Sequence, residues 1–140
     1  MPSNADFIQA AGMFRSAASE VYELMSNIES VGADQIVFGG SVGRDVPATI
    51  AAASGAAATC QGMLIDAAEI CDKRAADMAV YEEALRQFVE EEARYRERWQ
   101  AYDEKVDRAN DDPNAMPTEP TEPYPQRPVK PQWGVSPNRF

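Results

Sequence analysis

The sequence predicts an all-α protein: an antiparallel helical hairpin with a short first helix, a long second helix and a disordered proline-rich C-terminal tail. Apolar residues recur in alternating steps of three and four over two long segments, and glycines cluster between those segments. Eight of the ten prolines lie in the last thirty residues. Steps of three and four place apolar side chains along one side of a helix, which packs against another helix. We therefore expect a hairpin domain over residues 1–109 and a tail over residues 110–140.

The first helix is expected over about residues 4–31. Ser3 and Asp6 have the spacing of an N-terminal capping box, in which each side chain binds the backbone N–H of the other residue. Gly32 is well placed to end the helix, since glycine adopts the backbone angles that terminate helices. The apolar positions of this helix are Phe7, Ala10, Phe14, Ala17, Val21, Leu24, Ile28 and Val31.

Residues 32–45 are expected to form the hairpin connection because they carry further glycines, and Asp45 is suited to cap the next helix. The second helix is expected over about residues 46–109, with the same alternation of three and four. Its apolar positions in the first half are Val46, Ile50, Ala53, Ala57, Cys60, Leu64, Ala67, Cys71 and Met78.

Beyond Met78 the second helix continues its apolar series after the first helix has no residues left to pair with it. We name this series the aromatic seam, and it comprises Tyr81, Leu85, Phe88, Tyr95, Trp99 and Tyr102. An internal core would require the helix to fold back, yet residues 80–108 contain no glycine or proline for a turn. Exposed aromatic series are typical of protein interfaces, so these six residues are predicted to bind a protein partner.

The tail is too rich in proline for helix or sheet and should favour polyproline II. We expect residues 110–140 to be disordered. Two interpretations remain open for this segment: a plain linker, or a ligand for a proline-binding groove, with Tyr124 between prolines and a Pro-Val-Lys-Pro run at residues 128–131.

Composition excludes several classes of function. A net charge of −10 and a pI near 4.4 argue against binding to nucleic acid or to anionic membranes. No segment is expected to insert in a membrane, and Arg15, Glu20 and Glu23 interrupt the N-terminal residues too early for a cleavable signal. Histidine is absent, and Cys60 and Cys71 lie too far apart on one helix to form a disulfide. We predict no metal and no cofactor.

No group of residues predicts catalysis. Glu90, Glu91 and Glu92 are consecutive, so their carboxylates point away from one another around the helix, whereas catalytic carboxylates converge across a cleft. The serines have no histidine to serve as a general base, and the glycines near residue 40 lack the Lys-Ser/Thr of a phosphate-binding loop. The chain is predicted not to be an enzyme.

A helix, a glycine loop with an aromatic residue, and a second helix with aromatic-acid spacing together resemble the WXG-type and EspC-like proteins of type VII (ESX) secretion systems. Phe38 and Gly40 stand where that family carries the Trp and Gly of its turn motif. The family's export signal is Tyr-x-x-x-Asp/Glu after the second helix. Trp99 and Asp103 have that spacing, although a tryptophan replaces the tyrosine.

The resemblance implies a secretion substrate, or a partner subunit that pairs with another helical protein such as a larger toxin. It also implies a cytoplasmic protein that is exported by a route independent of a signal peptide. The alternative is an acidic helical structural or scaffolding protein, in phage assembly or as an adaptor, which acts by self-association. In both cases the partner is a protein: another helical hairpin, a larger secreted protein, or further copies of the chain.

Overall fold

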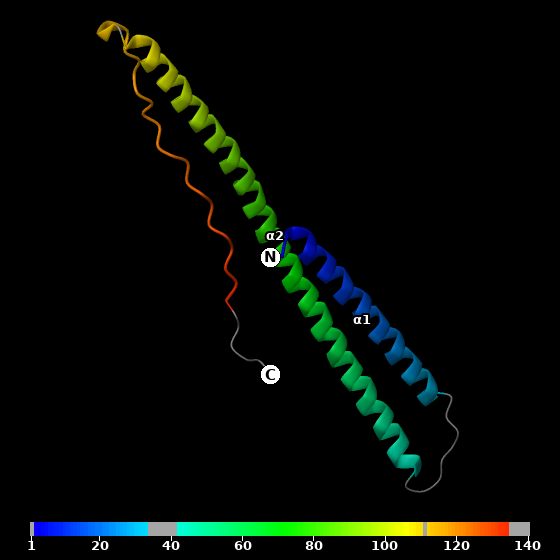
Figure 1. The fold of residues 1–140 in the computed structure, drawn as a ribbon. Coiled ribbons are helices and arrows are strands. Elements are labelled where there is room, and N and C mark those ends of the chain that lie inside the picture. The colour runs from blue at the N-terminus through cyan, green and yellow to red at the C-terminus, as the bar shows by residue number, and fades with distance from the viewer. Residues whose placement is uncertain (1, 34–41, 111, 135–140) are drawn as a thin grey trace. The chain divides into compact units, whose positions relative to one another are not determined.

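The computed structural model describes residues 2–33, 42–110 and 112–134, without the side chains of residues 31–33 and 42–44. The predicted fold is confirmed: the described residues form a shorter helix α1 (Asn4–Ala33), a long helix α2 (Val42–Ala109) and one 3-10 turn η1 (Pro113–Ala115) (Figure 1). No strand is present in these residues. The chain divides into two compact units, which meet within α2: unit 1 is Met1–Ala76 and unit 2 is Asp77–Phe140.

The start of α1 is fixed by the capping box that the sequence predicts. The backbone N–H of Ser3 donates to Asp6 Oδ2 at 2.7 Å, and the backbone N–H of Asp6 donates to Ser3 Oγ at 3.3 Å. These bonds supply partners for two backbone N–H groups that a helix start leaves unpaired. They also hold the pKa of the Asp6 carboxyl below its ordinary value, because the hydrogen bonds favour the charged form.

Both helices extend into the predicted connection. α1 ends at Ala33, so Gly32 lies inside the helix and does not end it. α2 begins at Val42, so Asp45 is in the first turn and Pro47 follows within the helix. Pro47 is the sixth residue of α2, past the N–H groups that have no intrahelical acceptor, so its missing N–H removes one backbone hydrogen bond near the start of the helix.

The interface between α1 and α2 in unit 1 is built from small residues. Its buried members are all alanine, and Met78 in unit 2 is the one large hydrophobic side chain that is buried among the described residues. Larger residues such as Phe14 and Leu64 are half-buried beside them. Alanines let two helices approach closely, so the hairpin is held by a thin layer of contacts. The buried alanines are Ala11, Ala18, Ala68 and Ala75.

The face of α2 toward α1 differs in part from the predicted one. Ala53 and Cys60 are exposed, whereas Ser54 and Gln61 are half-buried. Ser54 Oγ donates a hydrogen bond to Glu29 Oε1 at 3.1 Å, which favours a polar residue at the edge of the interface. Alanines lie on every side of residues 48–58, so the apolar pattern there fits more than one helix face.

We expected no segment long and apolar enough to cross a membrane, and this expectation is wrong. By those two criteria α2 includes one stretch that is long and apolar enough, and none of that stretch is buried. The helix has no charged residue from Val46 to Ile65, and many weakly apolar alanines there add up. Helices of soluble proteins pass the same test, so the finding does not assign a location.

Candidate interaction surfaces

The aromatic seam lies along α2 in unit 2, and all six of its residues are half-buried rather than exposed. The residues that cover it come from the tail, which sequence reasoning treated as a separate disordered segment. The tail returns along α2 within this unit, antiparallel to the helix (Figure 1). The proposed partner surface therefore has an occupant within the same chain.

A tight turn at the end of α2 reverses the chain. The backbone N–H of Asp112 donates to the Ala109 carbonyl at 2.9 Å, and the Asp112 side chain accepts from the backbone N–H of Asn114 at 3.0 Å. Pro113 follows Asp112 in this short 3-10 helix, where its fixed φ and missing N–H cost nothing. α2 ends at Ala109 and η1 follows over Pro113–Ala115, so the tail runs back along the helix.

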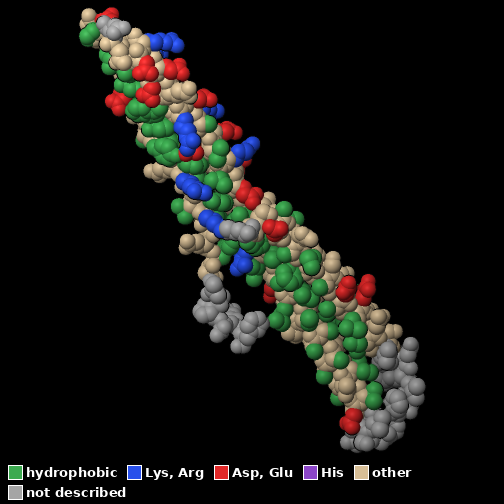
Figure 2. Space-filling view, viewed as in Figure 1, with side chains coloured by type: hydrophobic (Ala, Val, Ile, Leu, Met, Phe, Trp, Pro, Cys, Tyr) green, Lys and Arg blue, Asp and Glu red, His purple; other side chains and the backbone are tan. Residues whose placement is uncertain are grey.

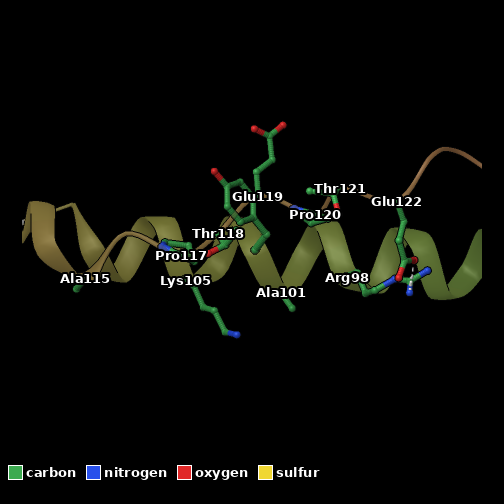
Figure 3. Close-up of a pocket in the computed structure, with 11 residues that line it drawn as sticks. Arg98, Ala101, Lys105, Ala115, Pro117, Thr118, Glu119, Pro120, Thr121 and Glu122 are labelled. Carbon is green, nitrogen blue, oxygen red and sulfur yellow. Dashed lines mark ion pairs between the residues drawn. The ribbon is translucent and has the colours of Figure 1, made fainter.

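Three polar contacts between the tail and α2 lie at intervals along the seam. Glu122 forms an ion pair with Arg98, the Tyr124 hydroxyl donates to Glu92 Oε1, and Trp133 Nε1 donates to Asp77 Oδ2 at 3.0 Å. Tail residues of increasing number therefore meet helix residues of decreasing number. Figure 3 shows the Arg98–Glu122 ion pair at one end of an open groove where the tail crosses the helix.

Aromatic rings connect the tail to the seam. The Tyr124 ring meets the Tyr95 ring edge to face, with centroids 5.2 Å apart and planes at 85°. Along the helix, Trp99 contacts Tyr95 at 6.2 Å and Tyr102 at 5.7 Å between centroids. Edge-to-face pairs in this distance range stabilise by about 0.5–1.5 kcal/mol beyond the area they bury.

The prolines of the tail face the helix with a regular period. Within residues 117–131, five prolines are half-buried and only Pro123 is exposed. Polyproline II has three residues per turn, so prolines three apart share one side. The series shifts by two residues around Tyr124, where the tyrosine ring meets Tyr95. The half-buried prolines are Pro117, Pro120, Pro125, Pro128 and Pro131.

Electrostatics couple the tail to the helix at Glu92. The hydrogen bond from Tyr124 lowers the pKa of the Glu92 carboxyl, and the positive charge of Arg96 lowers it further. The same hydrogen bond raises the pKa of the Tyr124 phenol, because losing its proton would place two negative charges together. Arg96 Nη2 lies 3.0 Å from Glu92 Oε1, one helix turn away.

One polar atom in the seam has no partner. The indole N–H of Trp99 is buried, and none of the described residues accepts a hydrogen bond from it. Buried tryptophan N–H groups normally find an acceptor. The docked tail therefore leaves one donor of the seam unused.

The tail matches the sequence-based expectation in one respect and differs in another. Beyond η1 the described tail residues form no helix or strand, as expected. Residues 117–134 nevertheless lie against α2 instead of forming a free disordered segment, and residues 135–140 are outside the described part of the chain. Sequence reasoning missed one signal in the tail, which is a three-residue spacing of prolines interrupted by Tyr124. This spacing suits packing along the aromatic seam, for which the sequence offered no other partner within the chain.

Unit 1 presents a second, uncovered surface at one edge of the hairpin, which we name the hairpin face. It consists of two large apolar side chains from each helix, all at least half exposed: Met13 (66%), Leu24 (55%), Met63 (59%) and Ile70 (50%). Hydrophobic side chains predominate on the side of this unit that Figure 2 shows. Leu24 belongs to the apolar series predicted for the first helix, yet the structure leaves it exposed at this edge.

Helical spacing places these four residues on one edge. Polar contacts mark the opposite edge: Arg15 pairs with Asp72, and Glu29 with Ser54. Met63 is nine residues from both Ser54 and Asp72, which is two and a half turns, so it faces the other way. Ile70, Met13 and Leu24 are each displaced by roughly half a turn from Asp72, Arg15 and Glu29, respectively. One edge thus carries the two polar pairs together with the exposed side chains of Ile8, Tyr22 and Ile65, and the other carries the four apolar side chains of the hairpin face.

Other sequence-predicted sites are not brought together. Phe38 and Gly40, the expected turn motif, lie outside the described residues. Trp99 is half-buried in the seam while Asp103, one turn later, is exposed. No group of three acidic or cysteine side chains that could hold a metal ion occurs among the described residues. Cys60 and Cys71 are free thiols, and Cys60 is exposed.

Three comparisons with known proteins were made. No protein-family model matches the chain, and no curated protein or solved structure matches it. The function is therefore inferred from the two surfaces described above.

Proposed function

We propose that this chain is a non-enzymatic helical interaction protein that pairs with another helical protein through the hairpin face. The observation that carries the proposal is the exposure of Met13, Leu24, Met63 and Ile70 on one edge of a two-helix unit. A helix pair with an apolar edge gains stability by packing against further helices, as in a four-helix bundle. The surrounding residues favour this because α2 carries no charge from Val46 to Ile65.

In its specific form, the proposal is a type VII secretion substrate or a partner subunit that presents a larger secreted protein. The chain is then cytoplasmic until a signal-peptide-independent export step. Its support is the resemblance in helix order and in the residues of the turn, Phe38 and Gly40, together with the spacing of Trp99 and Asp103. The second candidate is a scaffolding protein that self-associates, and the same hairpin face would then bind a second copy.

Charge substitutions on the hairpin face test the shared proposal. Met63→Glu with Ile70→Glu should abolish association while the helix content stays unchanged, since both side chains are exposed in the hairpin. Val80→Glu is the matched control, because Val80 is 72% exposed on the same helix but outside unit 1. The measurement is molar mass by light scattering over a concentration series. The proposal is contradicted if all variants and the parent chain show one constant monomer mass, with or without a helical partner.

Export is tested separately. A tagged chain expressed in a bacterium with a type VII system should reach the medium, and deletion of the secretion ATPase should stop it. Trp99→Ala and Asp103→Ala should each reduce export while circular dichroism remains unchanged. Appearance in the medium regardless of the ATPase would remove the secretion assignment and leave the scaffold candidate.

A further inference from the structure

We propose that the aromatic seam of α2 is a binding site for a polyproline II segment, and that the tail is its resident, exchangeable ligand. The occupant in trans is the tail of a second copy of this chain. This inference concerns unit 2 alone and does not depend on the hairpin face or on secretion.

The spacing of the prolines in the tail suits the aromatic seam of the helix. Half-buried prolines recur with a period of three, and Tyr124 packs on Tyr95 between the two proline series. Prolines packed on aromatic side chains are the general means by which proteins recognise polyproline II segments. The segment is rigid before binding, so it loses little conformational entropy on docking.

The polar contacts also fix the direction and the register of the tail on α2. Glu122 meets Arg98, Tyr124 meets Glu92, and Trp133 meets Asp77. Nine residues of polyproline II between Tyr124 and Trp133 span about 28 Å, and the fifteen helical residues from Asp77 to Glu92 span about 22 Å. The two lengths agree within the reach of the side chains. An antiparallel segment in another register would lose all three contacts.

The tail is held on the helix by side-chain contacts and not by a series of backbone hydrogen bonds. Apart from the turn at residues 109–115, no backbone–backbone hydrogen bond joins the described tail to the helix. The Trp99 indole N–H also has no acceptor. Polyproline II carbonyls have no partners of their own, so a segment that shifts slightly in the groove can offer one. Every contact made in cis is available unchanged to the tail of a second copy.

The cis tail competes with any trans ligand at an effective concentration in the millimolar range, because its linker is short. A substitution in the chain's own tail should therefore improve trans binding. A substitution in the seam weakens cis and trans binding alike and leaves the apparent affinity nearly unchanged. The effect of a seam substitution on trans binding therefore becomes measurable only in a chain whose own tail also carries a substitution.

The test uses the full chain and a labelled peptide of residues 115–134, with fluorescence anisotropy as the readout. Tyr124→Ala in the chain should tighten binding of the unaltered peptide by roughly 3- to 10-fold, the value of one aromatic pair. Adding Tyr95→Ala to that chain should erase the gain. A peptide with Tyr124→Ala should bind the Tyr124→Ala chain roughly 3- to 10-fold more weakly than the unaltered peptide.

Val129→Ala in the chain is the matched control, because Val129 is 86% exposed and its loss should leave the affinity unchanged. Circular dichroism confirms that each chain keeps its helices. The proposal is overturned if no chain binds the peptide, if Tyr124→Ala gives no gain over the parent chain, or if Tyr95→Ala leaves that gain intact.

Discussion

Units 1 and 2 differ in whether the large apolar side chains of α2 are covered. In unit 1 two helices meet through alanines, and large apolar side chains such as Met63 remain exposed at one edge. In unit 2 a single helix carries the larger aromatic residues, and a proline-rich segment of the same chain covers them. The comparison indicates that a helix without a helical partner can be covered by a proline-rich segment of its own chain, whereas the hairpin face in unit 1 stays exposed.

Charge follows the same division. From Val46 to Ile65, within unit 1, α2 has no charged residue, whereas its part in unit 2 is dense in both signs. Arg98 and Glu92 in unit 2 bind the tail, and Arg86 pairs with Glu83 on the helix surface at 2.5 Å. Exposed pairs of this kind contribute at most about 1 kcal/mol each. The charges therefore help to orient the tail, and the ring contact of Tyr124 with Tyr95 adds an aromatic interaction.

The largest expected effect comes from enlarging an alanine in the unit 1 interface. Ala68→Leu should lower the free energy of unfolding by about 1–3 kcal/mol, because Ala68 is 1% exposed and a larger side chain forces the helices apart. Thermal unfolding followed by circular dichroism measures the change. Ala58→Leu is the matched control, since Ala58 is exposed on the same helix. Equal effects at both positions would show that the helices do not meet at Ala68.

The Tyr95–Tyr124 pair should contribute a coupling of about 0.5–1.5 kcal/mol to the stability of unit 2. A double-mutant cycle of Tyr95→Ala and Tyr124→Ala isolates it from other effects of each substitution. Chemical denaturation provides the four free energies. A coupling energy of zero would mean that the tail does not dock on the seam in solution.

Two glycines of α2 provide a stabilising test. A Cβ added at Gly55 or Gly62 meets no atom within 4 Å, so these glycines do not serve close packing in the hairpin. Gly55→Ala and Gly62→Ala should each raise the free energy of unfolding by up to about 1 kcal/mol through helix propensity. If stability falls in the purified chain, something packs against these positions that the hairpin alone does not provide.

The smallest effect is a dependence of tail docking on pH. The pKa of Glu92 is lowered in the docked state, so its contribution is present above the ordinary glutamate pKa and is lost as pH falls through the lowered value. The pKa of Tyr124 is raised, so its contribution is present below the ordinary tyrosine pKa and is lost as pH rises through the raised value. Tryptophan fluorescence of the chain against pH should show both limits, since Trp99 lies in the seam and Trp133 in the tail.

Glu92→Gln is the control for the acid limit, since it keeps an acceptor for the Tyr124 hydroxyl but cannot be protonated in this range. The acid transition should disappear in this variant. A transition that persists unchanged would mean that another carboxyl controls docking.

The sequence was sufficient to predict the two helices, because an apolar series in steps of three and four has few other solutions. It also predicted the capping of α1 by Ser3 and Asp6, a local interaction between neighbouring residues. It did not predict which face of α2 meets α1 around Ser54, since alanines there fit several faces. The docking of Tyr124 was missed because a proline-rich segment has no internal periodic partner, and its contacts are far away in the chain, 32 residues in the case of Glu92.

The fluorescence of Trp99 shows whether the tail covers the aromatic seam in solution. In a Trp133→Phe chain Trp99 is the only tryptophan, so its emission and its quenching by acrylamide report the exposure of the seam. The account predicts short-wavelength emission and weak quenching in this chain, and a shift to longer wavelength with strong quenching once the tail is cut after residue 115. Equal quenching with and without the tail would contradict the account.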